Sequence, residues 1–193
     1  MEYILQTSDL CKNYGKAKIL KSVNIHVPKG SIYGFVGRNG AGKTTLIRVI
    51  TGLHTPTSGS YSLFGVSNND PQINEMRAKM GAVVETPSIY PDLNARENLK
   101  MMCRILGKPF DNVDEILKTV ELTNTGKKKA KDFSLGMRQR LGIAIALLGD
   151  PEFLVLDEPI NGLDPAGIKE IRDVILKLNK ELGITFLIYR PLR

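Results

Sequence analysis

The first ninety residues of the chain show the short apolar patterns that are typical of β-strands. Three such patterns predict strands at Tyr3–Thr7, Val23–Val27 and Ser31–Val36. The run Val27-Pro28-Lys29-Gly30 has the composition of a turn, so we expect the last two strands to pair as a hairpin. A second hairpin is expected around Ser60–Phe64, and Gly81–Val84 has the composition of a short buried strand.

The rest of the chain combines helical spacing with two further strands. Apolar residues recur at helical spacing in four segments: Ala95–Leu106, Val113–Leu122, Leu135–Leu148 and Pro165–Leu182. The continuous apolar run Phe153–Leu156 is typical of a strand that a parallel sheet buries on both faces, and Thr185–Ile188 is expected to be the last strand. This order predicts an α/β fold whose segments flank a helical middle of roughly sixty residues.

The composition is that of an ordinary soluble globular protein. Of the 193 residues, 42% are hydrophobic and 24% are charged, which excludes a disordered tail, a collagen-like fibre and a disulfide-rich miniprotein. The longest apolar stretch, Leu141–Leu148, is shorter than the about 20 residues that a membrane-spanning helix needs. Met1–Ile4 lacks a basic segment, so secretion is not expected. Cys11 and Cys103 lie far apart, which disfavours a zinc site and fits a reducing cytoplasm.

The net charge of +7 leaves several partners open. A basic chain is suited to contact nucleic acid, anionic lipid or phosphate groups, although a general bias toward solubility explains the same balance. The densest basic run, Lys127–Lys131, has no neighbouring aromatic residues on which bases would stack. We therefore interpret it as a solvated loop, with contact to acidic lipid headgroups as the alternative, and expect no specific nucleic acid as a partner.

The segment that follows Ser31–Val36 carries the strongest chemical signal. Residues 37–44 fit the pattern G-x-x-x-x-G-K-[ST], and helical spacing follows over Lys43–Thr51. Glycines allow backbone N–H groups to wrap around a polyphosphate, and the start of the helix offers its positive end. Lys43 adds a charge for the β- and γ-phosphates, while the hydroxyl of Thr44 is suited to hold Mg²⁺. The expected nucleotide-binding residues of this segment are Gly37, Arg38, Asn39, Gly40, Ala41, Gly42, Lys43, Thr44 and Thr45.

Two carboxylates follow the apolar run Phe153–Leu156. A strand that ends in Asp157 and Glu158 places both at the carboxyl edge of a parallel sheet, where α/β proteins bind ligands. Asp157 is suited to coordinate Mg²⁺, and Glu158 is suited to orient or deprotonate an attacking water. Beside a phosphate loop, this pair favours nucleotide hydrolysis over a solvated acidic turn.

A third motif begins the apolar helix Leu135–Leu148. Ser134 has the residue type of an N-cap, and Gly136 permits another group to approach closely. The N–H groups at this helix end make a second anion site, although a plain helix cap explains the same residues.

The order of these motifs resembles an ATP-binding cassette of ABC transporters. The phosphate loop, a helical insert, Ser134-Leu135-Gly136, Asp157-Glu158 and Asn161-Gly162-Leu163-Asp164 follow one another over nearly the whole chain. The resemblance implies a P-loop NTPase cassette with a mixed or parallel core sheet, an N-terminal antiparallel β part and an inserted helical lobe. It further implies one nucleotide-binding domain over residues 1–193, with an α/β core at 1–88 and 150–193 and the helical lobe at 89–149.

The resemblance also implies roles for single residues. Tyr14 matches the aromatic that stacks on adenine, with a surface or core tyrosine as the alternative. Ser134 and Gly136 match the signature contacts to the γ-phosphate held by an opposite subunit, and Asp164 matches the aspartate that links the two sites. ATP and Mg²⁺ are the expected cofactors. The expected Mg²⁺ ligands are Thr44, Asp157 and Glu85, and the expected catalytic residues are Glu158, Lys43 and Glu85.

Two positions depart from the family pattern. Glu85 occupies the place of a glutamine, where a carboxylate still reaches Mg²⁺ or a water, and it resembles what lantibiotic-immunity cassettes carry. The family places a switch histidine after Thr185–Ile188, where this chain has Tyr189-Arg190-Pro191-Leu192-Arg193. His26 and His54 do not match that position and are interpreted as structural or surface residues. We therefore expect slow hydrolysis and a truncated C-terminus, from a shortened chain or a frameshifted gene.

The resemblance predicts an ATP-hydrolysing subunit of an ABC transporter. The run Phe133–Arg140 resembles the signature of the subfamily that exports, or confers immunity to, bacitracin and lantibiotics, so we expect export of an antimicrobial peptide or a similar compound. ATP is expected to close a homodimer or a paired cassette, and separate membrane permease subunits are expected to dock near Glu85–Leu106. This places the chain at the cytoplasmic face of the cell membrane as a peripheral subunit. Two alternatives stay open: a soluble ABC ATPase that acts on ribosomes or nucleic acid, and a nucleotide-binding module with little hydrolysis.

Overall fold

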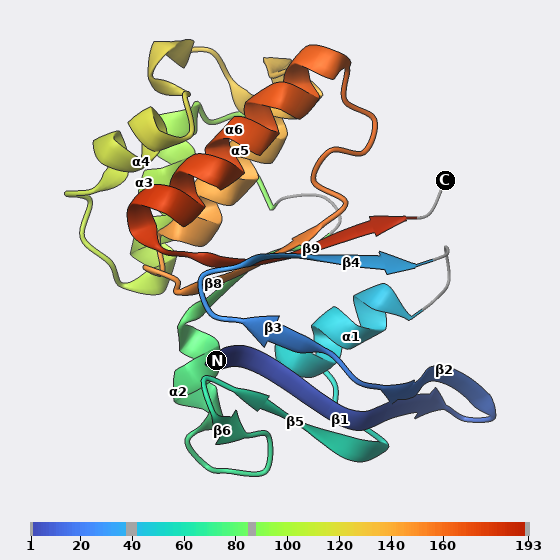
Figure 1. Ribbon diagram of the computed structural model, residues 1–193. Helices are drawn as coiled ribbons and strands as arrows, with labels where there is room; N and C mark the ends of the chain where they lie inside the picture. Colours follow the sequence, from blue (N-terminus) through green and yellow to red (C-terminus); the bar gives the residue numbers. More distant parts are fainter. Residues whose placement is uncertain (1, 38–41, 85–87, 192–193) are drawn as a thin grey trace.

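The strands of the protein form two sheets with a helix between them. The computed structural model describes residues 2–37, 42–84 and 88–191. Helix α1 (Lys43–Ile50) lies between a parallel and an antiparallel sheet, and further helices cover the other face of the parallel sheet (Figure 1). This layered arrangement confirms the α/β class that the sequence predicts.

The parallel sheet lies at the centre and has the strand order β4-β9-β8-β7 among the described residues. Its strands are β4 (Ile32–Gly37), β7 (Met80–Val83), β8 (Phe153–Asp157) and β9 (Thr185–Pro191). Phe153 and Val155 of β8 pack on the side of α1, whereas Leu154 and Leu156 pack on the opposite side. Because both faces are buried, β8 is apolar at successive positions instead of alternating with polar residues.

The antiparallel sheet forms the outer layer beside α1. Its strands are β1 (Tyr3–Tyr14), β2 (Ala17–Val23), β3 (His26–Pro28), β5 (Ser58–Leu63) and β6 (Val66–Ser67). Strand β1 pairs with β2, β3 and β5, and β5 forms the expected second hairpin with β6. The sequence pattern does not predict β2, because Leu20 is the only buried residue in it and the strand shows no alternation.

The first predicted hairpin, between Val23–Val27 and Ser31–Val36, is wrong. Strand β3 pairs antiparallel with β1, whereas β4 joins the other sheet and pairs parallel with β9. A turn is present, since the N–H of Ser31 donates to the carbonyl oxygen of Pro28 over 3.2 Å, but it carries the chain from one sheet to the other. Turn residues specify a change of direction and leave the partner of the next strand to tertiary packing.

Four helices lie on the far side of the parallel sheet: α3 (Ala95–Leu106), α4 (Val113–Thr119), α5 (Leu135–Leu147) and α6 (Pro165–Leu182). Short 3₁₀ turns η1 (Thr123–Thr125) and η2 (Ala130–Asp132) lie between α4 and α5. Helix α2 (Ile73–Ala78) precedes β7 and is too short to show a clear sequence period. Within the described ranges, no helix combines the length and the apolar character that crossing a membrane would take.

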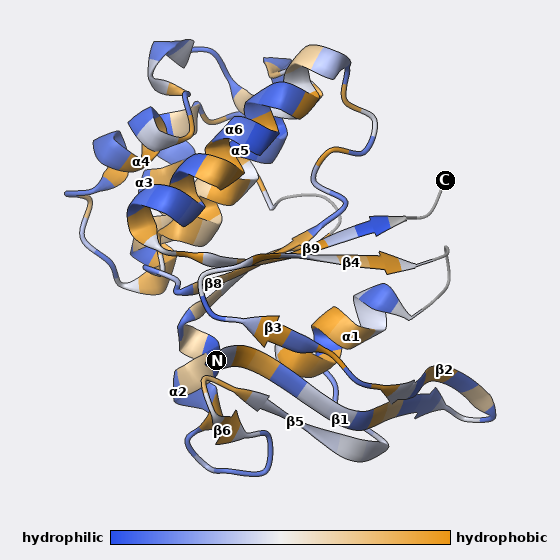
Figure 2. Ribbon diagram, in the orientation of Figure 1, coloured by the Kyte–Doolittle hydropathy of each residue, from blue (hydrophilic) through white to orange (hydrophobic). Residues whose placement is uncertain are grey.

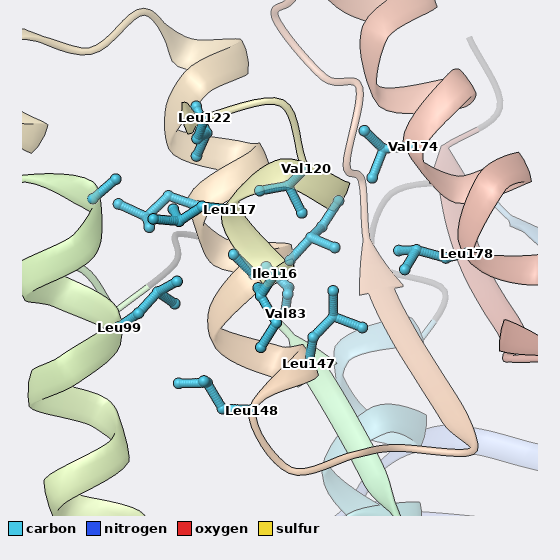
Figure 3. Packing of buried hydrophobic residues seen from close by; sticks show 14 of the residues in the cluster. Val83, Leu99, Ile116, Leu117, Val120, Leu122, Leu147, Leu148, Val174 and Leu178 are labelled. Atoms are coloured by element: carbon cyan, nitrogen blue, oxygen red, sulfur yellow. The ribbon is translucent and has the colours of Figure 1, made fainter. Parts of the chain in front are cut away.

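Two hydrophobic clusters hold the layers together. One joins α3, α4, α5 and α6 to the sheet, and Figure 3 shows side chains such as Leu99, Leu117 and Leu147 converging near Val83 of β7. The other packs Leu46 and Val49 of α1 between the two sheets. Figure 2 shows the corresponding hydrophobic segments along the central strands and α1. The ends of β4, β8 and β9 are therefore held in a fixed relation to the start of α1.

Candidate functional site

The two ends of the expected phosphate loop lie at one edge of the parallel sheet. Strand β4 ends at Gly37, and α1 begins at Lys43. Gly42 between them has a φ of +82°, and a Cβ atom there would lie 2.8 Å from the carbonyl oxygen of Ile19. Only glycine fits this backbone and this space, so the turn into α1 depends on it. No side chain of the described residues caps this helix end, which leaves its first N–H groups suited to an anion.

The ammonium group of Lys43 is buried between the loop and the last strand. Lys43 is 6% exposed, and its Nζ donates to the carbonyl oxygen of Gly37 over 2.8 Å. The same Nζ lies 3.8 Å from the ring centroid of Tyr189. Thr44 and Thr45 follow in the first turn of α1 and are half-buried. A buried ammonium beside a helix N-terminus makes an environment that suits phosphate oxygens.

Asp157 and Glu158 lie at the same edge as the loop because the strands that carry them are parallel. Asp157 of β8 lies opposite Tyr189 of β9, and Tyr189 lies opposite Phe35 of β4. The backbone of Asp157 is thus two strand spacings, about 10 Å, from that of Phe35, which lies two residues before the end of β4. Asp157 itself is 7% exposed. The structure therefore brings together the ends of the phosphate loop and the two carboxylates that sequence motifs single out.

Glu158 has an unusual backbone conformation. Its φ of +48° lies in the left-handed region that side chains rarely adopt. Its N–H donates to the carbonyl oxygen of Tyr189 over 3.1 Å, and its own carbonyl oxygen accepts from the N–H of Asn161 over 3.0 Å. These hydrogen bonds hold a tight turn directly after β8. Backbone held in such a region is frequent at functional sites, where the surrounding structure enforces it.

Tyr14 lies at the end of β1 with 43% of its surface exposed. Its hydroxyl forms a hydrogen bond with Nδ1 of His54, and the two rings meet edge to face with centroids 5.6 Å apart. The Nζ atom of Lys12 lies 5.1 Å from the centre of the Tyr14 ring. His54 therefore orients Tyr14, a link that the sequence does not reveal because 40 residues separate the two. Stacking of Tyr14 on adenine stays a prediction.

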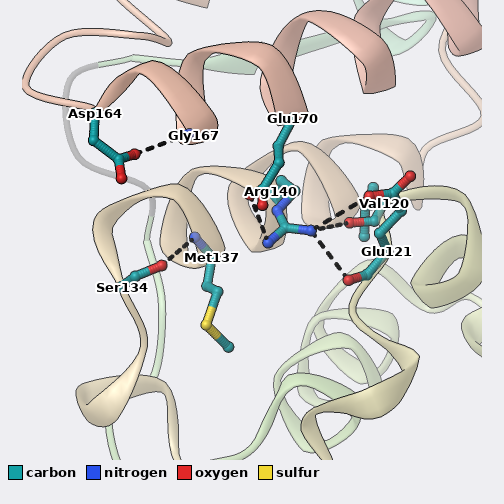
Figure 4. A network of polar contacts seen from close by, with 8 residues as sticks. All are labelled: Val120, Glu121, Ser134, Met137, Arg140, Asp164, Gly167 and Glu170. Carbon is teal, nitrogen blue, oxygen red and sulfur yellow. Dashed lines mark hydrogen bonds and ion pairs between the residues drawn. The ribbon is translucent and has the colours of Figure 1, made fainter.

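Ser134 and Asp164 cap two neighbouring helices (Figure 4). The Ser134 hydroxyl accepts the N–H of Met137 over 3.2 Å, which confirms Ser134 as the N-cap of α5. The Asp164 carboxylate accepts the N–H of Gly167 over 2.9 Å at the start of α6. Gly136 is buried where α5 meets α6, since a Cβ atom there would lie 3.8 Å from the Cα of Gly167. The expected contacts of these residues with an opposite subunit stay predictions.

A buried arginine holds these two helices together, although no sequence motif assigned it a role. Arg140 of α5 is 8% exposed, and its Nη2 lies 3.1 Å from a carboxylate oxygen of Glu170 in α6. Its Nη1 donates to the carbonyl oxygen of Glu121 over 3.1 Å, just beyond α4 (Figure 4). A charged residue directly before the apolar run Leu141–Leu148 is the sequence signal that would have found it.

Tyr189 is the second residue that motif reading missed, and it lies between the loop and the carboxylates. Its hydroxyl donates to the carbonyl oxygen of Gly37 over 3.3 Å. The sequence signal for Tyr189 is the alternation of side chains along a strand, which puts Leu187 and Tyr189 on one face of β9. Leu187 packs in the cluster that surrounds α1. Five expected site residues lie outside the described part of the chain: Arg38, Asn39, Gly40, Ala41 and Glu85.

Comparison with known sequences finds similarity to a transporter family and to ATP-binding proteins of transporters. Residues 20–161 match the family model described as ABC transporter. The bacitracin transport ATP-binding protein BcrA of Bacillus licheniformis is 51% identical over 189 residues, which are 97% of this chain and 61% of that protein. The lantibiotic transport ATP-binding protein SrtF of Streptococcus pyogenes is 43% identical over 185 residues, which are 96% of this chain and 79% of that protein. The chain thus spans 61% of the length of the bacitracin relative.

Solved structures show the same fold. The protein cbiO1 from Clostridium perfringens, described as part of the ABC transporter complex cbiONQ, superposes with a TM-score of 0.88 and 29% identity, covering 100% of this chain and 80% of that chain. The ATP-binding cassette MJ0796, solved as a dimer bound to ADP and Pi, superposes with a TM-score of 0.79 and 27% identity, covering 96% of this chain and 87% of that chain. These likenesses confirm the expected fold class.

Proposed function

Because this chain belongs to the ABC transporter family, we propose that it is an ATP-binding and ATP-hydrolysing subunit of a transporter that exports an antimicrobial peptide or a similar compound. Membership follows from the family match over residues 20–161 and from the relatives. The peptide class is supported by the relatives named for bacitracin transport and lantibiotic transport, which are 51% and 43% identical to the chain. The first and most testable part of this proposal is the binding of ATP.

The observation that carries the proposal is the buried ammonium of Lys43 at the uncapped start of α1. The Nζ atom is held at 2.8 Å from the carbonyl oxygen of Gly37, next to helix N–H groups that no described side chain caps. A triphosphate brings several negative charges to this place, and both the ammonium and the helix end stabilise them. Tyr14, oriented by His54, would receive the adenine ring on its exposed face.

The residues at the sheet edge also fit Mg²⁺. This ion prefers oxygen ligands and keeps several waters, so one or two protein ligands beside the phosphates suffice. The Thr44 hydroxyl in the first turn of α1 and the Asp157 carboxylate at the end of β8 supply such oxygens. Glu85 is proposed as a third ligand on sequence alone. When bound, Mg²⁺ would neutralise charge on the phosphate oxygens.

Glu158 is the residue we propose to position the attacking water. Its tight turn fixes where its half-buried side chain leaves β8, one residue beyond Asp157. Lys43 and Glu85 are proposed to assist by stabilising charge and by holding a water or the ion. We propose slow turnover, because residues 189–193, which follow the strand after which the family resemblance implies a switch histidine, contain no histidine.

We further propose that two cassettes close around ATP. In this arrangement the signature residues Ser134 and Gly136 of one copy meet the γ-phosphate held by the other, and Asp164 links the two sites. The caps at Ser134 and Asp164 lie on adjacent helices that Arg140 and Glu170 hold together, so both would reach the opposite copy as one unit. The dimer of MJ0796 with ADP and Pi is a precedent for such pairing in a related structure.

The membrane partner is proposed to dock on the segment Glu85–Leu106, at the cytoplasmic face of the membrane. Tyr90 in this segment is 42% exposed, so a photoreactive phenylalanine at position 90 would preserve the shape of the surface. We expect a crosslink in cells to a membrane permease subunit and none from the exposed position Leu182 on α6. Equal labelling from both positions, or no membrane adduct from position 90, would reject this docking segment.

Calorimetry with ATP and Mg²⁺ tests the central proposal. The chain should release or absorb heat on binding, and Lys43→Ala should abolish both that signal and the thermal stabilisation by ATP. Lys118→Ala, a change at an exposed lysine on α4, is the matched control and should bind as the unchanged chain does. Absence of binding by the folded, unchanged chain would reject the proposed function.

A second experiment tests hydrolysis and pairing. Glu158→Gln removes the acid that is proposed to position water but keeps the side-chain volume, so ATP should stay bound and the paired form should accumulate. Gel filtration with ATP and Mg²⁺ should then show a shift to twice the mass, and Glu152→Gln, at an exposed position just before β8, should not. An elution volume that does not respond to ATP in the Glu158→Gln variant would contradict pairing.

A further inference from the structure

We propose that Tyr189 is a positioning residue for phosphate binding, because its ring and hydroxyl together hold the ammonium of Lys43 and the carbonyl group of Gly37 in place. The inference rests on the proposed function, since the phosphates that Lys43 meets are those of the bound nucleotide. Tyr189 does not touch the reacting atoms itself. It acts through Lys43, and its effect should grow with the number of phosphates on the ligand.

The strand register places Tyr189 between β4, which leads into the expected phosphate loop, and β8, which carries Asp157. It lies opposite Phe35 of β4 on one side and opposite Asp157 of β8 on the other. Its side chain is on the same face of β9 as Leu187, and that face packs against α1. Tyr189 is 4% exposed, so its ring is part of the packed interior directly below the start of α1.

Three contacts link Tyr189, Lys43 and Gly37 to one another. The Lys43 ammonium lies 3.8 Å from the ring centroid, and its Nζ donates to the carbonyl oxygen of Gly37 over 2.8 Å. The Tyr189 hydroxyl donates to the same carbonyl oxygen over 3.3 Å. An ammonium attracted to an aromatic face is held more strongly when the site excludes water, as this one does. The last residue of β4 and the first residue of α1 are therefore both fixed to one side chain of β9.

This arrangement prepares Lys43 for an anion. A lysine side chain has four rotatable bonds, and immobilising it when a ligand binds lowers affinity. Tyr189 restricts those bonds beforehand, and the ammonium uses one N–H on Gly37, which leaves donors for phosphate oxygens. The main chain of Tyr189 also accepts the N–H of Glu158 over 3.1 Å, so the same residue fixes the turn that carries the proposed water-positioning acid.

Variants that keep the shape of the ring at position 189 but weaken its attraction for a cation distinguish a positioning role from a packing role. Tyr189→Phe removes only the hydroxyl, and a trifluorinated phenylalanine at position 189 keeps the ring size but weakens its attraction for a cation. Tyr189→Leu removes the ring. The matched control is Phe35→Leu, because Phe35 is the neighbouring ring, 6.5 Å away, on the adjacent strand. Calorimetry on each folded variant, with MgATP and with AMP, gives the affinity for ligands with three phosphates and with one.

We expect MgATP to bind to Tyr189→Leu about tenfold more weakly than to Tyr189→Phe. The trifluorinated variant should bind MgATP several-fold more weakly than Tyr189→Phe. Binding of AMP, which lacks the phosphates that Lys43 is expected to meet, should change by less than about twofold. Phe35→Leu should leave the ratio of the two affinities unchanged. If Tyr189→Leu does not fold, the comparison of the fluorinated ring with Tyr189→Phe alone decides the question.

Three outcomes would overturn the inference. MgATP affinity that does not depend on fluorination rejects the role of the ring, and equal losses for MgATP and AMP show that the residue acts only through packing. Tighter MgATP binding by the Tyr189 variants would mean that the ring competes with phosphate for the ammonium. In all three cases the unchanged chain still binds MgATP, so the proposed function stands. If the unchanged chain binds no nucleotide, the proposed function and this inference fail together.

Discussion

Replacing Arg140 by methionine should destabilise the protein by about 1 kcal/mol, and the structure indicates which interaction causes most of the loss. Methionine keeps most of the apolar stem, so the change mainly removes the guanidinium group. A hydrogen bond from a charged donor to a carbonyl group, here that of Glu121 at 3.1 Å, contributes roughly 1.5–3 kcal/mol. The pair with Glu170 adds at most about 1 kcal/mol, because the Glu170 side chain is 45% exposed and water screens the charges.

One term opposes this loss. Nε of Arg140 is buried without a hydrogen-bond partner among the described residues, and a group left in this way costs about 1–3 kcal/mol. Arg140→Met removes that cost, so the net loss falls to about 1 kcal/mol, which lowers the melting temperature by about 2–4 °C in a chain of this size. Glu170→Gln should cost about 0.5 kcal/mol or less, since it removes only the screened pair.

Chemical denaturation followed by circular dichroism measures both values and their coupling in the double variant. A loss for Glu170→Gln as large as that for Arg140→Met would show that the exposed ion pair dominates, and would refute the reasoning. A loss below about 0.5 kcal/mol for Arg140→Met would also refute the reasoning, because changes of that size are usual for surface residues without specific interactions.

Two further predictions concern the turn into α1 and the behaviour in acid. Gly42→Ala should lower the free energy of unfolding, measured with denaturant, by about 2 kcal/mol more than Gly30→Ala does. Both positions have a positive φ, but of the two only Gly42 has neighbouring atoms that the new Cβ would meet. Equal losses for the two variants would refute the clash. The hydrogen bond from Arg96 holds the pKa of the Asp114 carboxyl below its ordinary value of 3.8. The stabilisation that this pair provides is therefore full above that value and is lost as the pH falls through the lower folded-state pKa. Asp114→Asn should accordingly be less stable than the unchanged chain at pH 7 and equally stable near pH 2, and a difference that persists in acid would contradict the assignment.

Local sequence determined the type and place of most elements around the site. Pro165–Leu182 and Ala95–Leu106 form helices with the predicted bounds, since a cap and an apolar period agree at each. The family follows from the motifs alone and is confirmed by the match over residues 20–161, because phosphate binding needs glycines, a lysine and a helix start in immediate succession.

Tertiary structure decided which strands and side chains meet. The turn at Pro28–Gly30 has the residue types of a hairpin, yet β3 and β4 enter different sheets, because the partner of a strand depends on which edge the rest of the chain leaves open. The contacts of Lys43 with Tyr189 and of Tyr14 with His54 join residues 146 and 40 positions apart. No local period encodes such distances. The first contact forms where β9 of the parallel sheet packs beside the start of α1, and the second forms where the end of β1 meets the segment after α1. Residues so far apart in the sequence become neighbours only when these elements pack, and that packing decides which side chains surround the ends of the proposed phosphate-binding segment, residues 37–44.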